Sequence, residues 1–361
     1  MTGLVDHLTE LLDRTAATAI QVEVRSPELD LSWATGLDGI DQPVSTSSLF
    51  GVYCAGKPLT ALAIARLVDD GLLRFDQPIN QLLPDQRLII DDTTIDDLLS
   101  HNTGTWRNPA VAFVPLRRDV RRAHITEALA RSTPPPTRTY SEFVGWELLA
   151  FVIEAVTEQP FAEYLWSAII EPAGLSDHLE IRPERLIERR GDIRLNVSDV
   201  AGTPVPLVWE RSIDNLGDPC ASIGLYASMR GLVDLYVTLG RSLTAPGLVS
   251  SRSLHHLVEP AGEAAFDRVL DRPARHAHGF MVDLPHHGFP GLSERSFGHS
   301  GLSGMTFAGH DPDRQLSFAV HVNLSTNTDD GSASETPIAV QRRHDIVDQI
   351  LREYGDRADG A

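Results

Sequence analysis

The chain has 361 residues, a formal net charge of −19 and 42% hydrophobic residues, with an isoelectric point near 5.1. This length suits one large domain or two ordinary ones, and the apolar content suffices for a sizeable core. The negative charge argues against nucleic acid and against an anionic membrane as partners, because both would repel an acidic surface.

The N-terminal segment predicts an amphipathic surface helix. Leu4, Leu8 and Leu11 recur at helical spacing between acidic residues, without the basic start and continuous apolar run of a signal peptide. No apolar run reaches the roughly 18 residues that a membrane span needs. The two cysteines, Cys54 and Cys220, are expected to be free thiols in a chain without a secretion signal. These features predict a cytoplasmic protein.

The remaining elements follow in chain order. Alternating residues predict a strand hairpin at 19–24 and 29–34. Apolar residues at helical spacing predict a series of helices at 54–70, 93–100, 117–131, 142–158, 161–170 and 231–240. A second hairpin is expected at 305–308 and 317–323, followed by a helix at 346–354. Residues 180–220 match no clear pattern.

Strands at both ends of the chain enclose a helical block. This order predicts an α+β fold, in which an antiparallel sheet is completed by the two ends of the chain and flanked by the N- and C-terminal helices. We expect one catalytic domain over residues 1–361. Its sheet part would comprise about 1–60 and 270–361, and its inserted, mainly helical part about 61–269.

Cys54 and Lys57 form the most reactive pair in the sequence. They are three residues apart at the start of a predicted helix, where side chains of that spacing share a face. Lys57 is the one lysine among 31 basic residues, and lysine, unlike arginine, can lose its proton in a protein. A thiolate beside an ammonium at a helix N-terminus is a plausible nucleophile. A chance surface lysine in an arginine-rich chain is the alternative.

Three short motifs stand in order along the chain: Cys54-Ala-Gly-Lys57, Tyr140-Ser-Glu142 and His299-Ser-Gly301. Together they resemble the Ser-x-x-Lys, Tyr-x-Asn and Lys/His-x-Gly motifs of the serine β-lactamase and penicillin-binding-protein superfamily. The branch that they resemble most contains class C β-lactamases, DD-peptidases, esterases and acyltransferases. Matches to other family segments extend the resemblance from about Ala19 to Tyr354. It implies the β-lactamase/transpeptidase-like fold.

The resemblance also implies roles for the motif residues. Cys54 would attack an acyl carbon, while its own N–H and that of Leu302 would form the oxyanion hole. Lys57 and Tyr140 would move protons, and His299 would complete the proton network or bind substrate. The remaining substrate-binding candidates are Glu142, Ser300, Gly301 and Trp106, the last of which could equally belong to the core.

Two residues depart from the family pattern. Cys54 stands where the family has serine, which indicates thiol catalysis, an inactive protein or a deliberate exchange made to trap a complex. Glu142 stands where the family has asparagine. A carboxylate there would favour the ammonium form of Lys57, or hold an amine of the substrate, or face solvent.

The sequence therefore predicts an acyl-transfer enzyme that forms an S-acyl intermediate on Cys54 and needs no cofactor. A cytoplasmic acyltransferase or transamidase of secondary metabolism is favoured, because a thiolate exchanges readily with a thioester donor. Its partners would be a small-molecule acyl donor, such as a coenzyme A or carrier-protein thioester, and an acceptor. A hydrolase of esters or amides, a non-catalytic binding protein, and Cys/Lys chemistry such as cyclisation are the alternatives.

Other candidate residues point to no further site. The 14 histidines include several close pairs, but these pairs have no carboxylate or cysteine partner at zinc spacing, so no metal site is expected. Cys220 reads as a small packed residue. The loops at about 105–120 and 180–220 would line the pocket, yet they do not reveal the donor or the acceptor.

Overall fold

The computed structural model describes residues 2–15, 17–84, 92–103, 116–130, 139–200, 203–207, 210, 217–267, 269–270, 272–324 and 337–358. Trp106 lies outside this part of the chain. Among the described residues, no helix combines the length and the apolar character needed to cross a membrane.

The central element is a six-stranded antiparallel sheet in the order β11-β12-β13-β14-β1-β2. Its strands come from the two ends of the chain: β1 (Ala19–Arg25), β2 (Asp30–Gly36), β11 (Met281–Val282), β12 (Phe297–Ser300), β13 (Thr306–Asp311) and β14 (Leu316–Val322). β1 pairs with β14 from Ile20 opposite Val322 to Arg25 opposite Ser317. The α+β prediction is therefore confirmed, including the sheet that joins both ends of the chain.

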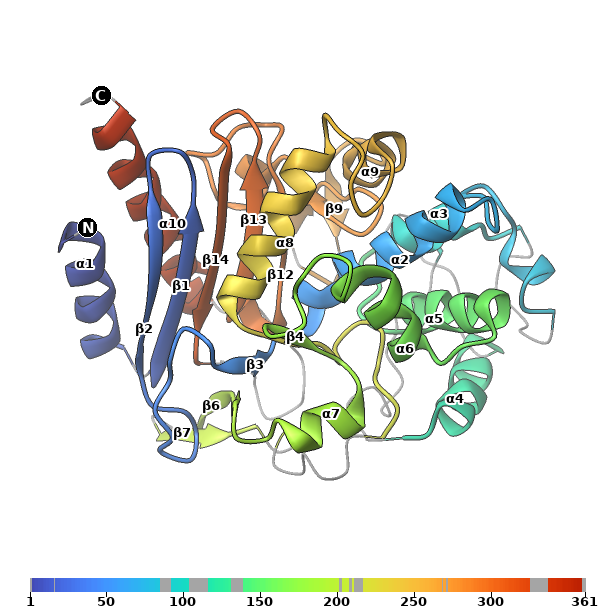
Figure 1. The fold of residues 1–361 in the computed structure, drawn as a ribbon, viewed down its shortest axis with the longest axis horizontal. Helices are drawn as coiled ribbons and strands as arrows, with labels where there is room; N and C mark the ends of the chain where they lie inside the picture. The colour runs from blue at the N-terminus through green and yellow to red at the C-terminus, as the bar shows by residue number, and fades with distance from the viewer. Residues whose placement is uncertain are drawn as a thin grey trace.

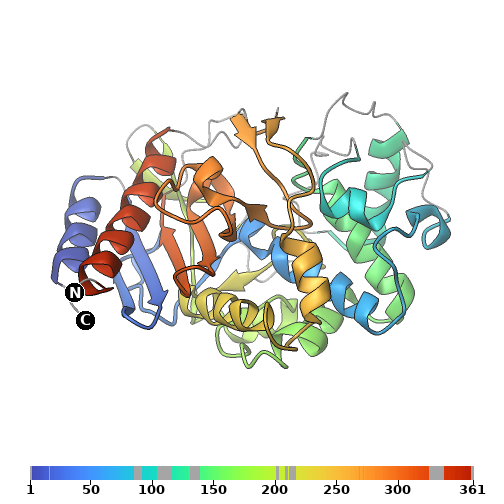
Figure 2. The same ribbon diagram turned by 90° about the horizontal axis from the view of Figure 1, so that it is seen from above.

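Three helices cover the two faces of this sheet (Figures 1 and 2). α1 (Thr2–Asp13) and α10 (Pro337–Ala358) lie side by side on one face, and α8 (Met229–Ser242) lies on the other. The period of two along β14 explains this: Phe318 and Val320 join the core beneath α1 and α10, while Ala319 joins the core on the α8 side. Both predicted terminal helices are confirmed.

The helical region lies beside the sheet, with α2 between them. Its helices are α2 (Lys57–Asp69), α3 (Ile95–Leu99), α4 (Arg118–Ala130), α5 (Val144–Thr157), α6 (Phe161–Leu165), α7 (Pro183–Glu188) and α9 (Ser251–Val258). α2 is buried on nearly every side from Lys57 to Leu67, as expected of a helix that is apolar all round. α7 and α9 are additions to the elements expected from the sequence.

Smaller strands complete the fold. A four-stranded sheet in the order β4-β8-β3-β5 and two strand pairs, β6-β7 and β9-β10, lie outside the central sheet. Their bounds are β3 (Leu49–Gly51), β4 (Leu179–Glu180), β5 (Ile193–Arg194), β6 (Val197–Val200), β7 (Thr203–Pro206), β8 (Tyr226–Ala227), β9 (Ala265–Asp267) and β10 (Arg272–Ala274).

Two predicted helices differ in detail from the structure. The helix expected from residue 54 begins only at Lys57, after a 3₁₀ turn, Tyr53–Gly56. Pro58 explains this start, because a proline with its fixed φ and missing N–H suits the first turn of an α-helix. The helix expected at 161–170 continues from α6 as a π-helical turn over Trp166–Ile170.

The division into a sheet part and a helical part remains a prediction. α8 falls within residues 61–269, the range expected for the helical part, and yet it packs against β1, β13 and β14.

Candidate active site

Cys54 lies in the 3₁₀ turn between β3 and α2, and its side chain is half-buried. The preceding residue, Tyr53, has φ of 49°, a left-handed conformation that costs a non-glycine residue about 1–3 kcal/mol. A buried network holds it: the Tyr53 hydroxyl donates to Glu210, and Glu210 also accepts from the Asn196 backbone and side chain at 2.7 and 2.8 Å. Asn196 in turn donates to the Gly51 carbonyl at 2.9 Å. Cys54 thus follows a strained residue that a buried hydrogen-bond network holds in place.

Lys57 is fully buried at the start of α2. Its Nζ donates to Cys54 Sγ at 3.0 Å and to the Tyr140 hydroxyl at 2.5 Å. The same Nζ lies 4.4 Å from the centre of the Tyr140 ring and 5.6 Å from that of Trp146. A buried amine is stable only with such partners. The side-by-side placement of thiol and amine that the spacing predicted is confirmed.

Tyr140 completes a chain of three reactive groups. Burial raises the pKa of Tyr140 well above 10.0, and the charge of Cys54, its hydrogen bond and the charge of Glu142 raise it further. The phenol therefore keeps its proton at neutral pH. It is in position to donate that proton to a leaving group and to receive one back.

Three residues outside the three short motifs hold Tyr140 in place. Asp267, in β9, accepts from the Tyr140 backbone N–H at 2.7 Å and from His276 Nε2 at 3.2 Å. The rings of His101 and His276 lie 4.6 and 5.8 Å from that of Tyr140. Burial would raise the pKa of Asp267, but the hydrogen bonds from His276 and the backbone outweigh it and lower the pKa. Asp267 is thus ionised, and it anchors the backbone of Tyr140.

The third motif reaches the site at the end of β12. His299 is 2% exposed, and its Nδ1 contacts the Ser300 carbonyl at 2.8 Å. Burial, with the charge of Lys57, lowers the pKa of His299 well below 6.5, so the ring is neutral. Gly301 follows, where an added Cβ would lie 2.6 Å from the Val52 carbonyl oxygen. Only glycine allows this strand end to approach the Cys54 turn so closely.

These residues surround a small cavity beside Sγ. Its volume is about 40 Å³. The cavity is lined by Cys54, Tyr140, Glu142, Leu270, His276, Met281, His299, Ser300, Gly301 and Leu302. The structure therefore brings together all the described candidate residues, with Lys57 joined through its hydrogen bonds. Their catalytic roles, including the oxyanion hole at the N–H groups of Cys54 and Leu302, remain predictions.

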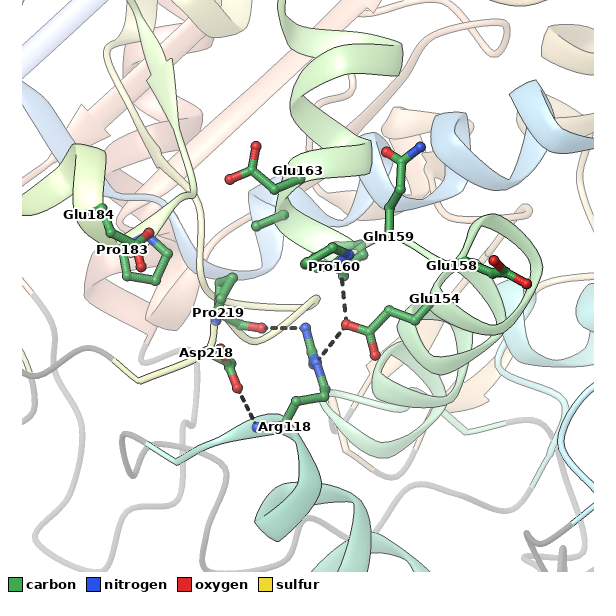
Figure 3. Close-up of a pocket in the computed structure, with 12 residues that line it drawn as sticks. Arg118, Glu154, Glu158, Gln159, Pro160, Glu163, Pro183, Glu184, Asp218 and Pro219 are labelled. Carbon is green, nitrogen blue, oxygen red and sulfur yellow. Dashed lines mark hydrogen bonds and ion pairs between the residues drawn. The ribbon is translucent and has the colours of Figure 1, made fainter.

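A buried ion network supports the loop behind the nucleophile. Glu147 in α5 accepts from Arg118 at 2.6 Å and from the Ala221 backbone at 2.6 Å. Figure 3 shows Arg118 in a surface pocket, where it also reaches Glu154 and the Pro219 carbonyl. The loop then continues to Leu225, whose carbonyl accepts from the Val52 N–H at 3.0 Å, next to the Cys54 turn.

Cys220 lies within this supported loop and is 5% exposed. Burial raises the pKa of its thiol to about 12, and the charge of Glu147 adds to this effect. Such a thiol is inert at neutral pH. The expectation of a packed residue, as opposed to a second nucleophile, agrees with this environment. Both cysteines are free, as expected.

Comparison with protein-family models gives a match over residues 12–342 to the family described as Beta-lactamase. Among curated proteins, "Esterase EstB" of Burkholderia gladioli is 26% identical over 252 residues, covering 60% of this chain and 64% of that protein. "Penicillin-binding protein 4*" of Bacillus subtilis (strain 168) is 26% identical over 159 residues, covering 40% of this chain and 34% of that protein. The chain thus spans less than two thirds of the length of either relative.

Solved structures share the fold at lower identity. A family VIII carboxylesterase superposes with a TM-score of 0.76 at 17% identity, covering 98% of this chain and 97% of that one. The D-amino acid amidase of Ochrobactrum anthropi SV3 gives 0.77 at 15% identity, covering 99% of both chains. "EstCE1, a hydrolase with promiscuous acyltransferase activity" gives 0.75 at 16% identity, covering 96% of this chain and 98% of that one.

Proposed function

Because this chain belongs to the beta-lactamase family, we propose that it is an acyl-transfer enzyme in which Cys54 forms a covalent S-acyl intermediate. The observation that carries the proposal is the contact of Lys57 Nζ with both Cys54 Sγ and the Tyr140 hydroxyl. One cation faces the sulfur, while the phenol keeps its proton and the nearby His299 is neutral. The geometry thus places a cation where it would stabilise the sulfur during the proposed attack.

In the first half of the proposed reaction, the Cys54 thiolate attacks the carbonyl carbon of the donor. A C–S bond forms as the bond to the leaving group breaks, and the leaving group departs with the bonding pair. A thiolate leaves as such, whereas an alkoxide takes a proton from Tyr140, which regains one from Lys57. The N–H groups of Cys54 and Leu302 would stabilise the tetrahedral oxyanion.

In the second half, an acceptor amine attacks the S-acyl carbon and expels the Cys54 thiolate. With a thioester donor, Tyr140 and Lys57 keep their protons in the first half, so the proton that the amine loses passes to solvent and protonates the released thiolate. With an ester donor, it passes through Tyr140 to Lys57 and replaces the proton that the alkoxide took. Glu142, on the rim of the cavity, would hold the cationic amine, which loses one proton to solvent and then attacks as the neutral amine. The net reaction converts a thioester and an amine into an amide and a free thiol.

We favour a thioester donor, such as a coenzyme A or carrier-protein thioester, and a transferase or transamidase of secondary metabolism. Exchange between a thioester and a thiolate needs little acid–base help, which suits a cysteine nucleophile. The cavity of about 40 Å³ admits the reacting acyl carbon, so the rest of a donor would extend outside it. A cytoplasmic location is part of the proposal, because a catalytic thiol must stay reduced, and cell fractionation tests it.

Hydrolysis is the second candidate. It is favoured by the names of the similar proteins, an esterase and a carboxylesterase among them. In a hydrolase of esters or amides, water would take the place of the acceptor amine and leave the first half-reaction unchanged.

Intact-mass spectrometry with a panel of thioester and activated-ester donors tests the nucleophile. Wild type and the matched variant Cys220→Ala should gain one acyl group, whereas Cys54→Ala should gain none. Cys54→Ser should acylate far more slowly, because an alcohol needs a strong base. The absence of an adduct with every donor, together with full activity in Cys54→Ala, would contradict the proposal.

A partition experiment separates the two candidates. The acyl-enzyme is formed first, and its decay is followed with and without a panel of primary amines. Amide formation that outruns hydrolysis supports a transferase. Decay at one rate regardless of the amine, with free acid as the product, supports a hydrolase and rejects transfer to amines.

A further inference from the structure

Asp96, His256 and His278 come together in a cluster, and none of them lines the cavity at Cys54. Asp96 belongs to α3, His256 to α9, and His278 to the turn between β10 and β11. One ligand atom from each lies within 4.8 Å of the others. His256 Nε2 is 2.8 Å from Asp96 Oδ1, and His278 Nε2 is 3.9 Å from the same oxygen.

The backbone orients the ring of His278. Its Nδ1 lies 2.9 Å from the His256 carbonyl oxygen, and a carbonyl can only accept, so Nδ1 carries a hydrogen. The other ring nitrogen, Nε2, faces Asp96 Oδ1. In metal-binding histidines, the ring nitrogen that does not ligate the ion usually donates to a carbonyl or a carboxylate, as Nδ1 does here.

Ring stacking orders the two imidazoles in advance. The His256 ring lies between those of Phe75 and His278, with centroid distances of 4.1 and 4.4 Å. The Asp96 N–H donates to the Phe75 carbonyl at 3.0 Å, which fixes the carboxylate beside this stack. The stacked rings and the backbone hydrogen bond of Asp96 therefore hold all three ligand side chains in place without an ion.

Solvent can also reach the cluster. The side chains of Asp96, His256 and His278 are 29%, 32% and 13% exposed. A surface groove of about 670 Å³ is lined by Asp96 and His256, together with acidic residues such as Asp69 and Asp76. Arg74 and Arg252 also line the groove, and Arg74 pairs with Asp76 at 2.9 Å, so the groove gives an ion a path to the cluster without a strong net charge.

We propose that Asp96, His256 and His278 bind a divalent transition-metal ion of the zinc class. Two imidazoles and one carboxylate are the ligand types that Zn²⁺ accepts at about 2.0–2.2 Å, whereas Ca²⁺ and Mg²⁺ prefer oxygen ligands alone. Small side-chain rotations would bring the three atoms onto one ion, and water would complete the shell. The sequence could not indicate this site, because Asp96 and His256 are 160 residues apart.

The ion would join three separate segments of the chain. α3 ends just before Ser100 and His101, and His278 follows His276 by two residues. His101 and His276 both contact the Tyr140 ring. Metal binding would thus stabilise the framework that holds Tyr140, without the ion taking part in the proposed chemistry.

Calorimetric titration of metal-free full-length protein with Zn²⁺ tests the site, with Co²⁺ absorption as a report on ligand geometry. Wild type should bind one Zn²⁺ tightly and show a raised Tm, because a ligand of the native state stabilises it. His256→Gln and Asp96→Asn should each weaken binding by more than about 10-fold, the loss that even an outer-shell change gives. His255→Gln, which changes the exposed neighbour in α9, should bind as wild type does.

Two controls keep the result decisive. Circular dichroism and Tm of the metal-free variants show whether each is folded. His256→Gln removes an imidazole and Asp96→Asn removes a carboxylate, so the two variants test the site independently. Cys54→Ala should retain the binding, since its thiol is outside the cluster. Wild-type affinity in both ligand variants would overturn the proposal, and so would binding that disappears only in Cys54→Ala, which would place the ion at the thiol.

Discussion

Lys57 illustrates how one buried side chain defines the chemistry around it. Its Nζ donates hydrogen bonds to the Cys54 sulfur and to the Tyr140 hydroxyl. Of these two acceptors, Cys54 would form an ion pair with Lys57 if it were a thiolate. Burial favours pairing of the charge inside the site, because an isolated ammonium there is costly. In the proposed reaction, this one contact would therefore give Lys57 its counter-ion and activate Cys54.

Removal of the Lys57 charge should slow acylation. Lys57→Met keeps the length and the apolar stem but loses the donor, so we expect acyl-enzyme formation to fall by about 10²–10⁴-fold, the usual range for proton-transfer groups. Rapid-quench mass spectrometry of the Cys54 adduct measures this rate. Lys57→Arg is the matched variant: it keeps the charge in a planar group and should recover part of the rate. An unchanged rate in Lys57→Met would show that the thiol is activated without this amine.

Glu142 should act on the binding of the acceptor. Its charge also raises the pKa of Tyr140, but a thioester donor takes no proton from that phenol. In Glu142→Gln the cavity keeps its size and loses one negative charge, so KM for a cationic amine should rise about tenfold, which corresponds to one charge-assisted contact of about 1.4 kcal/mol. The rate of acylation by a neutral donor should stay within twofold. A neutral acceptor is the matched comparison and should show no change. If KM for both kinds of acceptor stays constant, Glu142 does not bind the acceptor.

At this scale, the sequence predicts the residues that stand in motifs. The Cys54–Lys57 pair was identified by its spacing, and Tyr140, Glu142 and residues 299–302 were identified from motifs that resemble those of the family. All of them except Lys57 line one cavity, and Lys57 is joined to it by its hydrogen bonds with Cys54 and Tyr140. Asp267 and His276 were missed, because an aspartate at the end of a two-stranded pair and a histidine in an isolated β-bridge carry no local signal. Their importance arises only from the contacts with Tyr140 that the tertiary fold creates.

Among the elements, α5 supports the site indirectly, through a buried carboxylate that holds a neighbouring loop. Glu147 is fully buried and connects α4, through Arg118, with the loop at Ala221. The sequence pattern predicts α5 correctly, since its apolar residues recur with helical period. The pattern does not explain a carboxylate within the apolar run, because its two arginine partners come from another helix.

Glu147→Gln should therefore destabilise the protein strongly. The substitution leaves Arg118 and Arg121 facing an amide, and breaking a buried ion pair in this way costs about 3–5 kcal/mol. Urea denaturation followed by circular dichroism measures the loss. Glu163→Gln, an exposed change in α6, should stay within about 0.5 kcal/mol of wild type. A loss below about 1 kcal/mol in Glu147→Gln would indicate that the network contributes little to stability.

The start of α2 marks a limit of prediction from sequence. Apolar spacing placed a helix from residue 54, but the regular helix begins at Lys57 and Cys54 lies in the preceding 3₁₀ turn. Local propensity could not reveal that Tyr53 is held at positive φ by Glu210, a residue from a distant segment. The strain is a tertiary effect, and such effects gather at functional sites.

In the whole molecule, the two ends of the chain meet in the sheet, and this topology was predictable because the strands and the terminal helices have strong periodic patterns. Which polar side chains lie in the interior was not predictable from the sequence. Several histidines on the sheet are buried and neutral, including His299, His310 and His321. Burial lowers the pKa of His321 to about 3. A sequence containing 14 histidines does not show which of them are enclosed.

These buried histidines should make the fold sensitive to acid. Burial lowers the pKa of His310 from 6.5 to about 4, against a small opposing effect of Asp311. Since the unfolded chain takes up the proton at a higher pH than the folded chain, stability is full above pH 6.5 and is lost as the pH falls towards about 4. For His310 alone, the loss at about pH 5 amounts to about 2 kcal/mol.

His310→Asn should remove this part of the pH dependence. Asparagine does not titrate and can keep the hydrogen bond that His310 Nδ1 makes with Ser317 Oγ at 2.8 Å. We expect the variant to be less stable than wild type at neutral pH because of lost packing. Between about pH 7.5 and about pH 5, however, its free energy of unfolding should fall by about 2 kcal/mol less. Urea denaturation at both pH values measures this difference, and the exposed His255→Asn should fall in parallel with wild type. Parallel behaviour of His310→Asn as well would mean that His310 titrates normally in the folded protein.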